Sequence, residues 1–175
     1  MNAQDMITNY TFAEIELGAG AQLTRTVLAE DVQLFAAMSG DANPEHIDPD
    51  YAKDTVFHGV VAQGMWGGAL IASVIGTEYP GPGSVYLEQT LRFLQPVHVG
   101  DTLVVSVRVI GKEADTHHVT LACECTNASG TVVIDGVARV LATVVKIHRP
   151  RMPTKHVILS GKVLPAPAAP IAGIL

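Results

Sequence analysis

The chain has 175 residues, of which 48% are hydrophobic, so it can close one sizeable core and is expected to form one domain with extensions. Its formal net charge is −6, although five of its 11 basic residues follow position 145, where no acidic residue occurs. The main body is therefore acidic, which argues against nucleic-acid binding, since a surface that follows phosphates needs clustered Lys and Arg.

The N-terminus and the cysteines favour a cytoplasmic protein. The first residues lack a basic start followed by an apolar run, so we expect no signal peptide. Cys123 and Cys125 lie two positions apart in an alternating segment, so both are expected on one face of a strand as small buried hydrophobic residues. They form neither a CxxC pair nor a metal-ligand set, and we predict no metal site.

The first third of the chain predicts short extended segments and then helices. Residues 10–17 and 22–27 are expected to be extended, and a helix is expected over residues 29–38. Gly40 is suited to end this helix. Asn43, followed by proline, predicts the cap and first turn of a second short helix.

A charge-free run follows. Residues 59–77 contain no Lys, Arg, Asp or Glu, and on length alone this run would admit a membrane span. Five of these residues are glycine and Gln63 interrupts the run, so we expect no membrane span. Instead we predict a helix over residues 65–76 that its own protein buries on nearly every side.

After this run, the apolar residues recur at every second position. Apolar and polar residues alternate from Val85, from Leu103 and from Val119, which predicts half-buried strands. A last strand is expected over residues 131–145, in a central position or at an interface because it is apolar on both faces in places. Glycine-containing connections favour antiparallel pairing of successive strands. The predicted fold class is therefore α+β, with one long central helix packed on an antiparallel sheet.

The C-terminal residues have a different composition. Half of the ten prolines follow residue 148, in a segment that contains the run PAPAAP. We therefore expect a domain over residues 1–147 and a proline-rich tail or inter-domain linker over residues 148–175.

Two short stretches carry residues suited to chemistry. Asp41 and His46 lie five positions apart across a turn, so their side chains can converge on one water molecule. Residues of these types are also ordinary after a helix-ending glycine. The second stretch is Gln63–Gly64–Met65, where N–H groups at the start of a helix are unpaired and Gly64 lets a carbonyl oxygen approach closely. Alternatively, this glycine only eases entry into the helix.

With the predicted layout, these stretches resemble the MaoC-like, (R)-specific enoyl-CoA hydratases of the hot-dog fold. The matching text is FAAMSGDANPEHIDPDYA, then the block from QGMWGGALIASVIG to FLQPVHVGD, and the valine-rich strands after it, over residues 10–145. The likeness is greatest to the N-terminal hydratase-like domain that is fused to a phosphate acetyl- or butyryltransferase. The proline-rich tail would then be the linker to a C-terminal phosphate acyltransferase domain, or the remnant of such a linker.

The resemblance implies a role for each matching residue. Asp41 and His46 would jointly activate the water that adds to C3 of an enoyl-CoA and would return a proton to C2. The N–H of Gly64 would bind the thioester carbonyl, and Asn43 would help to hold the loop. The expected reaction is the reversible hydration of trans-2-enoyl-CoA to (R)-3-hydroxyacyl-CoA. It uses no metal and no cofactor other than the CoA of the substrate.

Four residues are expected to contact the substrate: Asn43, and beside the glycine Gln63, Met65 and Trp66. Of these, Trp66 would line the acyl pocket or serve in packing. Two positions depart from the family. Gln63 stands where His is common, and Ala72 stands where a hydroxyl often supports the catalytic Asp. Ser73 is one position further on, which on a helix turns its hydroxyl about 100° away.

The resemblance also implies assembly, as a homodimer or a dimer of dimers with the acyl-CoA site near the subunit interface. Two other functions stay open. The same fold could hydrolyse the thioester, although the placement of Asn43 and His46 in the hydratase-like motif argues against this. The chain could also be a non-catalytic, dimerising acyl-CoA-binding module, which Gln63 and Ala72 favour.

Overall fold

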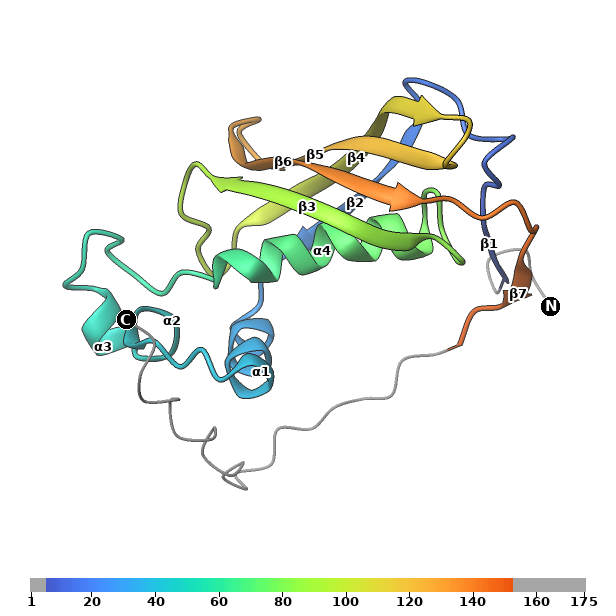
Figure 1. Ribbon diagram of the computed structural model, residues 1–175. Coiled ribbons are helices and arrows are strands. Elements are labelled where there is room, and N and C mark those ends of the chain that lie inside the picture. The colour runs from blue at the N-terminus through green and yellow to red at the C-terminus, as the bar shows by residue number, and fades with distance from the viewer. Residues whose placement is uncertain (1–5, 153–175) are drawn as a thin grey trace, which may run out of the picture.

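A five-stranded antiparallel sheet covers one side of a long helix, α4 (Gly64–Thr77), in a computed structural model that describes residues 6–152 (Figure 1). The strand order is β2-β4-β5-β6-β3. The strands are β2 (Gly20–Thr26), β3 (Val85–Phe93), β4 (Thr102–Glu113), β5 (His118–Asn127) and β6 (Val132–Leu141). The predicted α+β class and the central helix are confirmed, because the helix was expected over residues 65–76.

The core lies between α4 and the inner face of the sheet. Alternate residues of β4 and β5 are buried there, as the period of two predicted. The core is aliphatic, and its fully buried members include Ile71, Val74, Ile75, Leu103, Val105 and Leu121. Cys123 and Cys125 are also buried in it, as predicted, and burial raises the pKa values of their thiols to about 11 and about 12.

The strand pairing differs from the prediction at one point. β3 pairs with β6 rather than with β4, its successor in the chain. The connection between β3 and β4, residues 94–101, contains Pro96 and does not form a tight hairpin. Instead the carbonyl of Val97 accepts a hydrogen bond from the N–H of Ala62, so this connector pairs with the segment before α4. β6 holds the predicted central position but ends at Leu141 rather than at residue 145.

The prediction that α4 is buried on nearly every side is wrong for this chain. The sheet covers one side of the helix, and its other side exposes Met65, Ala69, Ala72, Ser73 and Gly76. The neighbouring edge strand β3 was expected to be half-buried, yet Val85, Leu87 and Phe93 are exposed on it. The small and apolar residues that predicted burial therefore form an uncovered apolar surface.

Three short helices lie beside the N-terminal end of α4: α1 (Ala29–Ser39), α2 (Pro44–Ile47) and α3 (Pro49–Ala52) (Figure 1). Gly40 ends α1 with a φ of 79°, as expected for a left-handed helix terminus. Asn43 caps α2, since its side chain accepts a hydrogen bond from the N–H of Glu45 at 3.3 Å. The start and stop signals in this part of the sequence are thus confirmed.

The opposite end of the molecule holds a two-stranded sheet of β1 (Met6–Thr8) and β7 (His148–Pro150). β7 lies in the predicted tail, and residues 153–175 of that tail lie outside the described residues. Residues 10–17 form turns rather than the expected extended segment, because the N–H and hydroxyl of Thr11 both donate to the carboxylate of Glu14. Within residues 6–152, no helix has both the length and the apolar character needed to span a membrane.

Candidate active site

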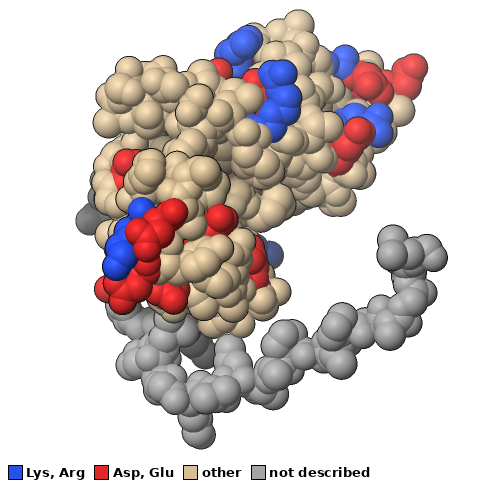
Figure 2. All heavy atoms as spheres, turned by 90° about the vertical axis from the view of Figure 1, so that its left-hand side faces the viewer, with Lys and Arg blue, Asp and Glu red and all other residues tan. Residues whose placement is uncertain are grey.

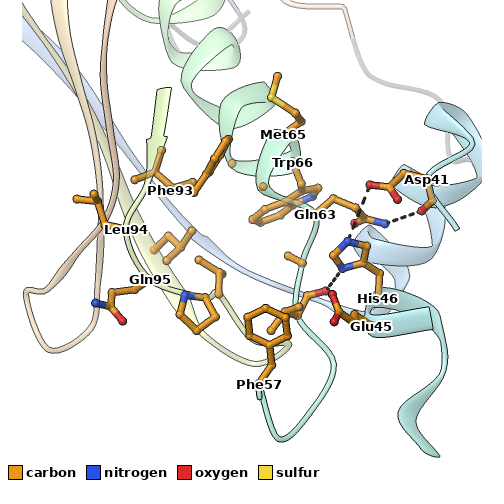
Figure 3. A pocket seen from close by; sticks show the side chains of 18 residues that line it. Asp41, Glu45, His46, Phe57, Gln63, Met65, Trp66, Phe93, Leu94 and Gln95 are labelled. Atoms are coloured by element: carbon orange, nitrogen blue, oxygen red, sulfur yellow. Dashed lines mark hydrogen bonds and ion pairs between the residues drawn. The ribbon is translucent and has the colours of Figure 1, made fainter. Parts of the chain in front are cut away.

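A pocket of about 530 Å³ opens where the N-terminus of α4 meets the loop after α1 and the connector between β3 and β4 (Figure 3). Six of the predicted site residues line it, from two separate stretches of the chain: Asp41, His46, Gln63, Gly64, Met65 and Trp66. The size is within the range of small-molecule sites. The fold thus brings both predicted stretches to one cavity.

Asp41 follows Gly40, whose left-handed conformation turns the chain away from α1 and toward the pocket. The N–H of Asp41 donates to the hydroxyl of Ser39 at 3.1 Å, which holds the start of this turn. The side chain of Asp41 is 49% exposed, and its Oδ2 lies 3.9 Å from Nε2 of His46 (Figure 3). The carboxylate is therefore open to a ligand and is not consumed by a direct hydrogen bond to the imidazole.

The tautomer of His46 follows from its second ring nitrogen. Nδ1 lies 2.7 Å from the carbonyl oxygen of Val61, and because a carbonyl can only accept, Nδ1 must carry a hydrogen. In the neutral ring, Nε2 then has a free lone pair, which faces Asp41. The ring nitrogen that can accept a proton therefore lies on the side of Asp41, and both residues line the pocket.

Gly64 begins α4, and its N–H has no acceptor among residues 6–152, as helix geometry requires at this position. The positive end of the helix dipole adds to the attraction of this N–H for an anionic oxygen. A Cβ atom at Gly64 would lie 2.9 Å from the ring of Phe93. The glycine therefore lets α4 approach β3 closely and also leaves its N–H accessible.

The other predicted contact residues differ in position. Gln63 and Trp66 are both buried in the pocket wall, and Met65 also lines the pocket but is largely exposed. Asn43 does not line the pocket, and its side chain caps α2 instead. Ala72 is exposed on the uncovered side of α4 and also lies outside the pocket lining.

Several lining residues were not predicted from the sequence. Glu45 lies within the predicted motif, between the two candidate catalytic residues, yet no role was assigned to it. Phe57 comes from the loop before α4, and its carbonyl oxygen lies 2.9 Å from Nε2 of His98, which holds that loop. Residues 94–97 of the connector between β3 and β4 form the opposite wall. The apolar residues around Pro96 are the signal for this wall in the sequence. That signal can be interpreted only when the path of the connector is known.

Acidic side chains gather on the lobe formed by α2 and α3, beside the pocket (Figure 2). They are Glu45, Asp48, Asp50 and Asp54, with Lys53 as the single basic residue among them. This charge repels phosphate groups, so a CoA ligand would carry its phosphates away from this lobe. In the described part of the chain, no three His, Cys, Asp or Glu side chains are grouped as a metal ion would need.

Comparison with known proteins identifies the family. The model of the MaoC like domain matches residues 12–128, which include both candidate stretches. The chain belongs to the MaoC-like family. An (R)-specific enoyl-CoA hydratase from Rhodospirillum rubrum is 43% identical to the MaoC-like chain over 141 residues, which cover 81% of this chain and 96% of the relative. A 3-hydroxybutyryl-CoA dehydratase from Methylorubrum extorquens is 39% identical over 74% of this chain and 82% of its own length.

The solved structure of the R-hydratase PhaJ1 from Pseudomonas aeruginosa has a TM-score of 0.85 to this MaoC-like chain. It is 40% identical, and the match covers 89% of this chain and 99% of that one. The predicted hot-dog fold is thereby confirmed. The relatives named here are hydratases and dehydratases, so the expected likeness to a domain fused to an acyltransferase stays a prediction without their support.

Proposed function

We propose that the chain catalyses the reversible hydration of trans-2-enoyl-CoA to (R)-3-hydroxyacyl-CoA. The observation that carries this proposal is the convergence of Asp41, His46 and Gly64 on one pocket, although 18 positions of sequence separate the second from the third. The names of the relatives, hydratase and dehydratase, support the same reaction in its two directions.

The water that reacts would lie between Asp41 and His46. Two acceptors 3.9 Å apart can both receive hydrogen bonds of about 2.8 Å from one water molecule. As the water oxygen bonds to C3, one of its protons passes to Nε2 of His46, which is free because Nδ1 donates to Val61. The Asp41 carboxylate stabilises the imidazolium that forms, and the pair returns a proton to C2.

The electron pair of the double bond moves toward the thioester oxygen as C3 is attacked, and negative charge develops on that oxygen. The N–H of Gly64, which has no acceptor within residues 6–152, and the N-terminal dipole of α4 are suited to stabilise this charge. When C2 takes up the proton, the charge returns and the carbonyl is restored. Water has then been added as a hydroxyl at C3 and a hydrogen at C2, without metal or redox cofactor.

The chain would act as a homodimer or a dimer of such dimers, joined through the uncovered apolar surface. Edge strand β3 exposes Val85 and Leu87, and the adjacent side of α4 exposes Ala69 and Ala72. An edge strand that pairs antiparallel with its own copy gives a two-fold interface and satisfies its free backbone groups. Sedimentation of Leu87→Asp tests this proposal, because a charge there should yield monomers where the native protein yields dimers.

The reaction is tested with purified protein and crotonyl-CoA. Hydration removes the absorbance of the conjugated enoyl thioester without releasing a thiol, and the product should be the (R)-3-hydroxy thioester. Release of free CoA would instead identify a thioesterase. Saturable binding of crotonyl-CoA with unchanged absorbance would identify a non-catalytic acyl-CoA-binding module.

A further inference from the structure

Gln63 connects three parts of the candidate site. Its side chain is 2% exposed, and its Nε2 donates to the carbonyl oxygens of Val32 in α1 and of Asp41, both at 3.3 Å (Figure 3). The two ends of the Asp41 residue are then both held, since its N–H donates to Ser39 and its C=O accepts from Gln63. The backbone that carries the Asp41 carboxylate is thus attached directly to the start of α4.

The orientation of the amide is determined by its neighbours. Turning the amide over would place Oε1 against two carbonyl oxygens, which only accept hydrogen bonds. In the observed orientation Oε1 is buried and has no donor within residues 6–152. A buried acceptor without a partner is unfavourable. The residue thus gives up one hydrogen bond and keeps both donors directed at the two carbonyls.

Gln63 is also covalently linked to the candidate oxyanion donor. The N–H of Gly64 belongs to the peptide bond that joins these two residues, so the position of Gln63 determines the position of that N–H. Its side chain meanwhile holds the backbone of Asp41. One residue therefore sets the distance between the group that would activate water and the group that would bind the thioester oxygen.

We propose that Gln63 is a positioning residue, which keeps Asp41 in register with the Gly64 N–H and touches neither the substrate nor the reacting water. This inference rests on the proposed hydration and replaces the expectation that Gln63 contacts the substrate. It also explains how a residue other than the common His can serve at this position. Two amide hydrogens reach two carbonyls at once, and this sets the relation between α1, the loop and α4.

The central test is Gln63→Met, which keeps the length and volume of the side chain but removes both donors. We expect kcat for crotonyl-CoA hydration to fall about 10²-fold, because small displacements of reacting groups are that costly. KM should change by less than about threefold, and the melting temperature should hardly fall because the unpaired Oε1 is removed as well. Gln33→Met on the exposed side of α1 is the matched control and should behave as the native protein.

A second variant, Gln63→Glu, makes kcat depend on pH in a way that a purely structural role would not. In Gln63→Glu, the ionised carboxylate cannot donate to the two carbonyls, whereas the protonated acid regains one donor. Burial beside two carbonyl oxygens raises the pKa of such a carboxyl. The ratio of kcat for this variant to native kcat should therefore rise as the pH falls from about 8 to about 6. A pH-independent ratio would contradict the proposal.

Hydrogen exchange separates failure of this inference from failure of the proposed function. Amide exchange over residues 39–47 should be at least about tenfold faster in Gln63→Met than in Gln33→Met, whether or not the protein hydrates enoyl-CoA. An inactive native protein with this exchange difference would reject the hydration and retain the positioning role. Equal exchange in the two variants, or a kcat within about twofold of native in an active Gln63→Met, would overturn the positioning role.

Discussion

Asn9 and Gln63 are the two buried polar side chains among residues 6–152, and they lie at opposite ends of α4. Asn9 is 1% exposed, and both polar atoms of its side chain have a partner: Nδ2 donates to the carbonyl of Val145 at 2.9 Å, and Oδ1 accepts from the N–H of Ile147 at 2.8 Å. Gln63 leaves its Oε1 without a donor in the described part of the chain. The amide oxygen therefore has a donor at one end of the helix and has none, among the described residues, at the other.

The polar groups around the two amides also differ in whether they have partners. Near Asn9, the ammonium of Lys146 donates to the backbone carbonyl of Asn9 at 2.6 Å and to the carboxylate of Glu14. The ammonium of Lys112 donates to the backbone carbonyls of Phe12 and Ile15. Near Gln63, the carboxylate of Asp41 is half exposed, and the N–H of Gly64 has no acceptor among the described residues. At one end of the molecule these polar groups are paired with one another, and at the other end they are open to a ligand of the kind proposed above.

The largest expected effect is the loss of kcat on substitution of Asp41 or His46 at the pocket end of the molecule. Asp41→Asn and His46→Gln each remove one member of the proposed base, and we expect kcat to fall by about 10²–10⁴-fold. The melting temperature of Asp41→Asn should change little, since Asp41 is exposed and forms no hydrogen bond through its carboxylate within residues 6–152. Steady-state kinetics with crotonyl-CoA and thermal unfolding measure both quantities.

Asp115→Asn is the matched control for this first prediction. It makes the same chemical change in the turn between β4 and β5, at the far end, where the carboxylate has no hydrogen bond or ion pair in the described residues. Activity that survives in Asp41→Asn at the level of Asp115→Asn would remove Asp41 from the mechanism.

Local signals explain how much of this arrangement could be predicted from the sequence. Gly40 and Asn43 act within a few residues of their own position, so the end of α1 and the start of α2 could be read directly. The two site stretches could be found because each has its own local pattern. Their convergence needed the resemblance to a known family, since no local rule relates residue 41 to residue 64.

Long-range pairing could not be read in this way. The partner of β3 depends on where the connector containing Pro96 goes, and that path is decided by contact of Val97 with Ala62. Alternation in β3 correctly predicted a strand but not its exposed edge position. The burial of Gln63 was also missed, because its two acceptors, at residues 32 and 41, come from parts of the chain distant in sequence.

The second prediction compares the two amides directly. Asn9→Leu removes both side-chain hydrogen bonds and leaves the Val145 carbonyl and the Ile147 N–H with fewer partners, so we expect a loss of about 2–4 kcal/mol in the free energy of unfolding. The kcat of the folded variant should stay native. Gln63→Met should show the reverse, with lower kcat and a smaller loss of stability. Chemical denaturation and steady-state kinetics measure both quantities. If Asn9→Leu and Gln63→Met lost similar amounts of stability and of kcat, the proposed difference between the two ends would be wrong.

The smallest effect concerns the pH dependence of the stable end. The hydrogen bond from Lys146, followed by those from the N–H and hydroxyl of Thr11, lowers the pKa of Glu14 from 4.5 to about 2. Because the folded pKa lies below the unfolded one, this carboxylate stabilises the fold above pH 4.5, and the contribution is lost as the pH falls from 4.5 toward about 2. Glu14→Gln lacks this titration.

The difference in free energy of unfolding between the native protein and Glu14→Gln should therefore be constant near neutral pH and shrink through this acidic window. It should also shrink at high salt, since the carboxylate lies at the surface. Denaturation curves of both proteins at several pH values measure the difference, in which all other titrating groups cancel. A difference that stays constant down to about pH 2 would mean that Lys146 is held by the backbone carbonyl of Asn9 alone, and that the charge of Glu14 adds nothing to this end of the molecule.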